Sequence, residues 1–212
     1  MTRVLSNLRR NDQGAAATEF AMVLPLLLIL LLGTIDVGRF LWAVNRAEKA
    51  TQVGARMAVV TTALSPDLIT ADFASGSLPA GSLIPADALG KVQCDSDGCE
   101  CTVDPCPFST GAVASTFDSV LVARMKDIMP EIEADNVRVS YSGSGFGYAG
   151  SPVSSPGGGS APPEAMEISP LITVSLTDLQ FRPITTLLLA EVNLPEFAST
   201  LPAEDASGSY SN

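Results

Sequence analysis

The chain has 212 residues, a length that accommodates one membrane-spanning segment and one modest folded domain. Its formal net charge is −11, and it contains no histidine. Without histidine the chain lacks the usual general base, the usual metal ligand and any Ser-His-Asp or Cys-His triad, so we expect no enzyme, no metal, no cofactor and no small-molecule substrate. The acidic excess opposes contacts with phosphates, so we expect no nucleic-acid partner.

The chain begins with a short basic leader, residues 1–14, followed by an apolar segment that we predict to be a transmembrane helix, residues 15–36. The 21 residues from Ala15 to Ile35 would form a helix roughly 31 Å long, close to the thickness of the hydrocarbon core. A signal peptide would need a small-residue cleavage site after the apolar run, a lipoprotein signal would need a cysteine there, and a core helix would need a polar face. The sequence provides none of these features, which favours a retained anchor.

Two residues of this anchor are unusual for a membrane segment. A carboxylate costs roughly 2.5 kcal/mol or more at the bilayer centre, so Glu19 near the start of the anchor is a candidate functional residue. The alternative is that Glu19 is an ordinary carboxylate, favoured by the dipole at the N-terminus of a helix. Pro25 has no N–H to bond the Ala21 carbonyl, so we expect a kink in the helix at this position.

The helix is predicted to continue through residues 37–60, because no proline follows until Pro66. Mostly small residues recur there at spacings of three and four, which places them on one face. The members of this small-residue stripe are Phe40, Val44, Ala47, Thr51, Gly54 and Ala58. Such a stripe lets another element approach closely, either the protein's own head or a helix of another chain.

Residues 61–202 are expected to form a small head, with Thr116 capping a helix that runs to about Met129 and with strands near 136–141 and 168–176. Between these strands, residues 142–163 are rich in Gly, Ser and Pro and read as a flexible loop. The apolar run 181–189 is too short to span a membrane, and residues 203–212 read as a disordered tail. The predicted fold class is therefore α+β: a long N-terminal transmembrane helix continuing into a small head.

The head contains all four cysteines of the chain, within residues 94–106. Their spacing lacks the paired knuckles of common zinc sites, which favours two disulfides over a metal site. Turn-like sequences between the cysteines favour the pairs Cys94–Cys99 and Cys101–Cys106 among the three possible pairings. Because disulfides persist in oxidising compartments, the head is expected outside the cytoplasm; basic residues flank both ends of the anchor and leave the orientation open.

Four stretches of the N-terminal third resemble the TadE-like family, the pseudopilin-like components of bacterial tight-adherence (Flp, type IVc) pilus systems. They are Arg9-Arg-Asn-Asp-Gln-Gly14-Ala-Ala-Ala-Thr-Glu19-Phe20, Leu24-Pro25-Leu-Leu-Leu28, Gly33-Thr-Ile-Asp-Val-Gly-Arg39 and Ala50-Thr-Gln-Val-Gly54-Ala-Arg56. The resemblance covers roughly residues 9–60. It departs from the family at Phe20, where members often have Tyr: the aromatic ring is kept and the hydroxyl is lost.

The resemblance implies that a prepilin-type peptidase cleaves after Gly14, so that Ala15 becomes the first mature residue and Glu19 the fifth. It also implies the function of a minor pilin or pseudopilin that assists assembly of a Tad pilus, with other pilins or pseudopilins, the prepilin peptidase and the inner membrane as partners. The N-terminus would be cytoplasmic and the head periplasmic, or incorporated into an extracellular pilus. An alternative is a signal-anchored envelope protein whose acidic head binds a surface or partner without polymerising.

Overall fold

The computed structural model describes residues 13–75, 77–108, 110–150, 166–185 and 191–203. The leader up to residue 12, the part of the predicted loop at 151–163 and the tail from 204 lie outside the described residues. Contacts divide the chain into two compact units. We name the first, residues 1–43 with 180–192, the anchor unit, and the second, residues 44–179 with 193–212, the head unit.

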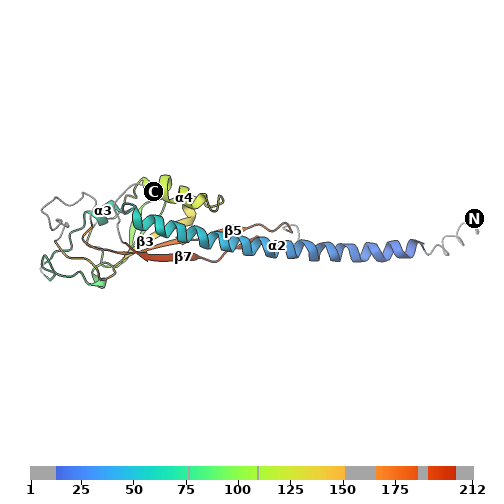
Figure 1. Ribbon diagram of the computed structural model, residues 1–212, viewed down its shortest axis with the longest axis horizontal. Coiled ribbons are helices and arrows are strands. Elements are labelled where there is room, and N and C mark those ends of the chain that lie inside the picture. Colours follow the sequence, from blue (N-terminus) through green and yellow to red (C-terminus); the bar gives the residue numbers. More distant parts are fainter. Residues whose placement is uncertain (1–12, 76, 109, 151–165, 186–190, 204–212) are drawn as a thin grey trace, which may run out of the picture. The chain divides into compact units, whose positions relative to one another are not determined.

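The longest element is helix α2, Gln13–Val60, which contributes to both units (Figure 1). Its 48 residues are rich in Ala and Leu, which are good helix formers, and the helix ends before the Pro66 of the next helix. Within the part of the chain that the structure describes, α2 is the one helix long and apolar enough to cross a membrane. The predicted plan of a long N-terminal apolar helix followed by a small α+β head is therefore confirmed.

The head unit is built on a five-stranded antiparallel sheet in the order β2-β1-β3-β4-β7. The central strands, β3 (Val137–Ser142) and β4 (Leu171–Leu176), correspond to the two strands predicted from alternation, and they pair in register with Val139 opposite Val174. The sequence interpretation missed the outer strands. These are β1 (Lys91–Cys94), β2 (Cys99–Val103) and β7 (Phe197–Pro202).

One face of this sheet packs on helices and forms the core of the head unit. Ile172, Val174 and Leu176 of β4 are fully buried on that face, and Figure 1 shows the later turns of α2 lying alongside the sheet. Tyr141 of β3 is also fully buried, and its hydroxyl accepts a hydrogen bond from the Leu64 N–H at 2.9 Å. A buried phenol is thereby satisfied by the backbone that follows α2.

Short helical elements complete the head unit. The helix predicted to start after Thr116 is a π-helical turn, η2 (Phe117–Val122), continuing into α4 (Ala123–Lys126). The expected Thr116 cap is wrong: Thr116 itself has helical dihedral angles, and its side chain makes no capping hydrogen bond. The remaining elements of the head unit are α3 (Pro66–Ile69), η1 (Ala86–Ala88) and η3 (Ala134–Asn136). A two-stranded sheet pairs β5 (Gln180–Phe181), which belongs to the anchor unit, with β6 (Val192–Asn193), which lies at the boundary of the two units along the chain.

Candidate functional site: the anchor helix and its carboxylates

The residues expected to act in processing and assembly all lie in the first turns of α2. Gly14 and Ala15 lie in its first turn, and Glu19 and Phe20 follow about one turn later, both with exposed side chains. No ion pair joins Glu19 to any residue of the chain within the described ranges. The geometry therefore leaves the carboxylate accessible to a partner from outside this chain.

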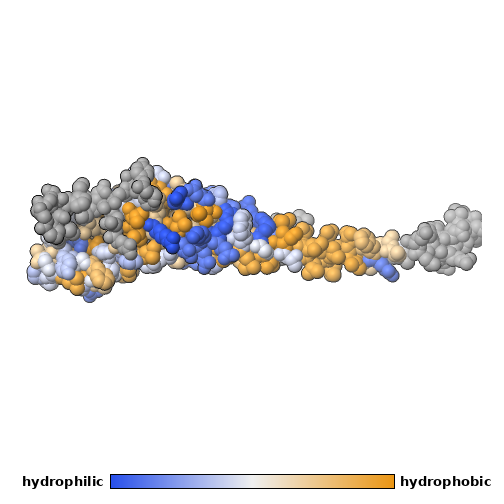
Figure 2. All heavy atoms as spheres, viewed as in Figure 1, coloured by the Kyte–Doolittle hydropathy of each residue, from blue (hydrophilic) through white to orange (hydrophobic). Residues whose placement is uncertain are grey.

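Beyond Glu19, α2 presents an apolar surface on every side. Each Phe, Met, Val, Leu and Ile side chain from Phe20 to Leu32 is exposed, and Figure 2 shows the hydrophobic surface along this part of the helix. A helix that is apolar all round belongs in a protein core or in a membrane, and this one is not buried by its own chain. The helix continues through Pro25 without a break, and the expected kink at this residue stays a prediction.

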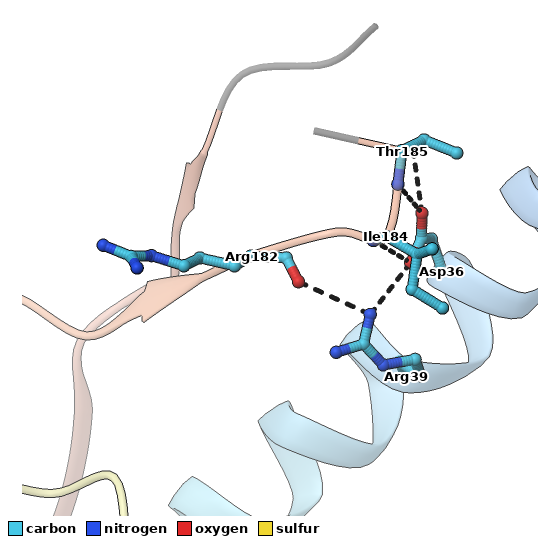
Figure 3. A network of polar contacts seen from close by, with 5 residues as sticks. All are labelled: Asp36, Arg39, Arg182, Ile184 and Thr185. Carbon is cyan, nitrogen blue, oxygen red and sulfur yellow. Dashed lines mark hydrogen bonds and ion pairs between the residues drawn. The ribbon is translucent and has the colours of Figure 1, made fainter. Parts of the chain in front are cut away.

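At the end of the apolar segment lies a second carboxylate, that of Asp36, which is only 5% exposed. It accepts hydrogen bonds from the Ile184 N–H at 2.7 Å and from the Thr185 N–H and hydroxyl at 2.9 and 2.8 Å (Figure 3). One turn along the helix, the Arg39 guanidinium forms an ion pair with Asp36 at 3.0 Å. We name these contacts the Asp36 clamp, because they attach residues 181–185 to the anchor helix.

Arg39 extends the Asp36 clamp along the segment. Its guanidinium donates to the Arg182 carbonyl at 3.4 Å (Figure 3). The guanidinium also lies 5.4 Å from the centre of the Phe181 ring. That ring in turn makes an edge-to-face contact with Phe40, with 5.5 Å between the ring centres. Asp36, Arg39 and Phe40 share one helix face because they are three and four residues apart. The clamp holds the backbone of residues 181–185 in place, so it positions this segment and does not catalyse a reaction.

The sequence interpretation assigned no role to Asp36, although it quoted the residue within the family-like stretch. The same reasoning that selected Glu19 would have found it, since Asp36 is also a carboxylate at the edge of an apolar segment. Its partners could not have been found that way. They lie 148 and 149 positions further along the chain, and most of the donors are backbone N–H groups.

The small-residue stripe of α2 packs on the protein's own head from Ala47 onward. Ala47, Thr51, Gly54 and Ala58 are buried in the head unit. A Cβ atom added at Gly54 would lie 2.8 Å from the Met125 sulfur. The sequence predicts that the stripe packs either on the protein's own head or on a helix of another chain. In the structure it packs on the protein's own head.

The four cysteines form two disulfides, Cys94–Cys99 and Cys101–Cys106, the pairing that the turn-like spacers favour. The first disulfide closes the β1–β2 hairpin, whose strands pair antiparallel. Within the described ranges, no three Cys, Asp or Glu side chains come together as a metal site. The cysteines therefore stabilise a local hairpin and the turn that follows it.

The chain consists of an exposed apolar helix that continues into a small antiparallel head, which defines the class of proteins that carry a folded head on a helical anchor. The length and apolar surface of the helix fit attachment to a membrane. Comparison with known families narrows this class: residues 14–56 match the family model described as TadE-like protein, which confirms the resemblance predicted from the sequence. That family suggests a membrane-anchored protein associated with a Tad pilus. No curated protein and no solved structure matches the chain.

Proposed function

We propose that this protein is a membrane-anchored minor pilin or pseudopilin that assists assembly of a Tad (Flp, type IVc) pilus. The observation that carries the proposal is the extent of the family match, which begins at Gly14 and covers the apolar helix and the small-residue stripe as far as Gly54. The other pilins or pseudopilins of the system are its partners in the inner membrane. The protein is structural in this role, and its working part is the helix rather than the head.

In this proposal a prepilin-type peptidase removes the leader by cutting after Gly14. Glycine at the cut lets the backbone enter a peptidase cleft closely, because it carries no side chain. The anchor spans the inner membrane with the leader in the cytoplasm and the head in the periplasm, where the two disulfides are stable. The mature chain then starts with the α-amine of Ala15.

That new α-amine gives Glu19 a partner. A positive charge on the first residue of one subunit would pair with the Glu19 carboxylate of its neighbour and offset the cost of placing a carboxylate near lipid. Packing of the apolar helices would drive assembly, and the ion pair would set their register. The exposure of Glu19 in the single chain is what such an intermolecular contact requires.

Processing is tested by mass spectrometry of the protein extracted from membranes of cells that contain the peptidase. We expect an N-terminus at Ala15, and we expect Gly14→Leu to retain the leader, because a bulky residue blocks the close approach of the backbone. Cells without the peptidase provide the control. An intact Met1 start in the wild-type protein would contradict the proposal.

The assembly role is tested with Glu19→Ala, which should impair piliation while leaving the protein in the membrane fraction. Glu48→Ala is the matched control, because Glu48 is an exposed carboxylate on the same helix outside the apolar segment. Normal piliation with Glu19→Ala would remove the assembly role. It would favour instead an anchored envelope protein whose acidic head binds a surface without polymerising.

A further inference from the structure

The exposed apolar surface of α2 does not end at Asp36, the last residue of the span predicted from sequence. Val37, Leu41 and Trp42 are 61%, 55% and 62% exposed. On the segment held by the Asp36 clamp, the Ile184 side chain is 53% exposed. All of these residues belong to the anchor unit, so the apolar surface of the anchor continues along the helix and onto the clamped segment.

The placement of these side chains around the helix points to lipid rather than to one partner helix. At about 100° per residue, Val37, Leu41 and Trp42 lie within one arc of about 140°, on the side of the helix away from Asp36 and Phe40. In the preceding turns, from Phe20 to Leu32, the exposed apolar residues lie on every side of the helix, whereas a single partner helix covers one stripe. A bilayer covers every side that the protein leaves open, which fits an apolar surface that surrounds the helix and continues onto this arc.

The length of the exposed apolar surface also fits a bilayer. The 22 residues from Phe20 to Leu41 form about 33 Å of helix, and the hydrocarbon core is about 30 Å thick. This span has Glu19 at one end and Trp42 at the other, and tryptophan is enriched where hydrocarbon meets the head groups. The sequence-based span of 15–36 would instead place three exposed apolar residues, Val37, Leu41 and Trp42, in water.

If the bilayer covers Phe20 to Leu41, Asp36 lies within the hydrocarbon core, six residues or about 9 Å along the helix axis from Trp42. A carboxylate at that depth needs partners, and an irregular segment there needs its backbone donors satisfied. The Asp36 clamp meets both needs at once, because the Ile184 and Thr185 N–H groups bond the carboxylate. The Arg39 guanidinium pairs with Asp36 and balances the remaining charge, and its side chain stays 44% exposed.

We propose that the membrane span is Phe20–Leu41, and that the clamped segment 181–185 lies at the lipid interface on the head side of the bilayer. The partner of this surface is lipid, with Trp42 at the level of the head groups and Ile184 in contact with the acyl boundary. The segment thus serves as a second membrane contact beside the helix. This inference rests on membrane anchoring and not on pilus assembly.

Trp42 is the only tryptophan of the chain, so its fluorescence reports its own surroundings. The full-length protein is reconstituted into vesicles of phosphatidylethanolamine and phosphatidylglycerol, with lipids brominated high on the acyl chain or with iodide in the buffer as quenchers. We expect several-fold stronger quenching by the brominated lipids than by iodide. Stronger quenching by iodide would place Trp42 in water, and shielding from both quenchers would mean that protein covers it; either result overturns the proposal.

The clamped segment is tested by moving the tryptophan. In Trp42→Phe/Ile184→Trp the new reporter should also be quenched mainly by brominated lipid. The matched control is Trp42→Phe/Phe146→Trp, because Phe146 is exposed on the head unit and should be quenched by iodide. Iodide quenching at position 184 would remove the segment from the interface and overturn that part of the proposal. N-terminal processing and piliation, measured separately, stay independent of these outcomes.

Discussion

Replacing Gly54 by leucine tests the packing of α2 on the head most directly. A Cβ atom at this position would lie 2.8 Å from the Met125 sulfur and 3.2 Å from a methyl carbon of Val174. Both neighbours are fully buried, so the further carbons of a leucine side chain have no open space to occupy. The sheet and the short helix must move away from α2, or the leucine must adopt a strained rotamer.

The expected loss of stability follows from two opposing effects. Overpacking a well-filled core costs about 1–3 kcal/mol, and a leucine against two buried neighbours belongs at the upper end. Removing a glycine from a helix returns about 0.8 kcal/mol. The net destabilisation is about 2 kcal/mol, which corresponds to a Tm lower by about 4–8 °C for a domain of this size. Gly54→Ala should change stability much less, since the helix gain of about 1 kcal/mol then nearly offsets a milder clash.

The assay is thermal unfolding of the full-length protein in detergent micelles, followed by near-ultraviolet circular dichroism. Gln52→Leu is the control, because Gln52 is exposed on the same helix and the change should stay within about 0.5 kcal/mol. A Tm of Gly54→Leu equal to or above that of the wild type would refute the packing argument. If that variant also lost piliation, the stripe would serve another chain's helix.

Two further substitutions test contacts made by buried polar groups. Asp36→Ala removes the acceptor of the Thr185 N–H, so amide hydrogen exchange in the 180–185 segment should become faster while exchange in β4 stays unchanged; unchanged exchange in both would contradict the clamp. Tyr141→Phe leaves the buried Leu64 N–H without its acceptor and should cost about 1–3 kcal/mol, measured by thermal unfolding, with an unchanged Tm as the contradicting result. Burial raises the pKa of the Tyr141 phenol well above its ordinary value of 10.0, against the opposing effect of the Leu64 N–H. The unfolded state therefore loses this proton first, and the contribution of Tyr141 to stability is present below pH 10.0 and lost as the pH rises above it. In an alkaline titration followed by near-ultraviolet absorbance, comparison of the wild type with Tyr141→Phe isolates this residue among the three tyrosines of the chain. The Tyr141 phenolate should appear only with unfolding; a Tyr141 phenolate in the folded protein would contradict this.

The parts of the fold that follow from local pattern could be predicted. The long helix could be predicted because apolar residues and good helix formers continue from the anchor to Val60 with one proline inside. The central strands could be predicted because valines and aromatic or branched residues alternate in them, and the structure buries the expected face. In these segments local preference and tertiary packing favour the same conformation.

The outer strands depend on their neighbours instead. Lys91–Cys94 has four residues, and its strand conformation is stabilised by pairing with β3 on one side and β2 on the other. Such short segments carry little intrinsic preference, so sheet pairing decides their conformation. The Asp36 clamp could not be predicted from local sequence pattern for a related reason. Backbone N–H groups are present at nearly every residue, and only the fold determines which of them reach a carboxylate.

The connection between β4 and β7 has a consequence for how the protein can vary. These two strands are antiparallel neighbours, and a hydrogen bond from the Leu194 N–H to the Leu179 carbonyl at 2.8 Å closes the base of the chain between them. The residues between Leu179 and Leu194 are thus an insertion into a hairpin that is already closed. Related proteins could lengthen, shorten or exchange this insertion without changing a strand of the head, because loop length costs little once the ends are held together. The contact that this part of the chain makes outside the head can therefore evolve separately from the sheet.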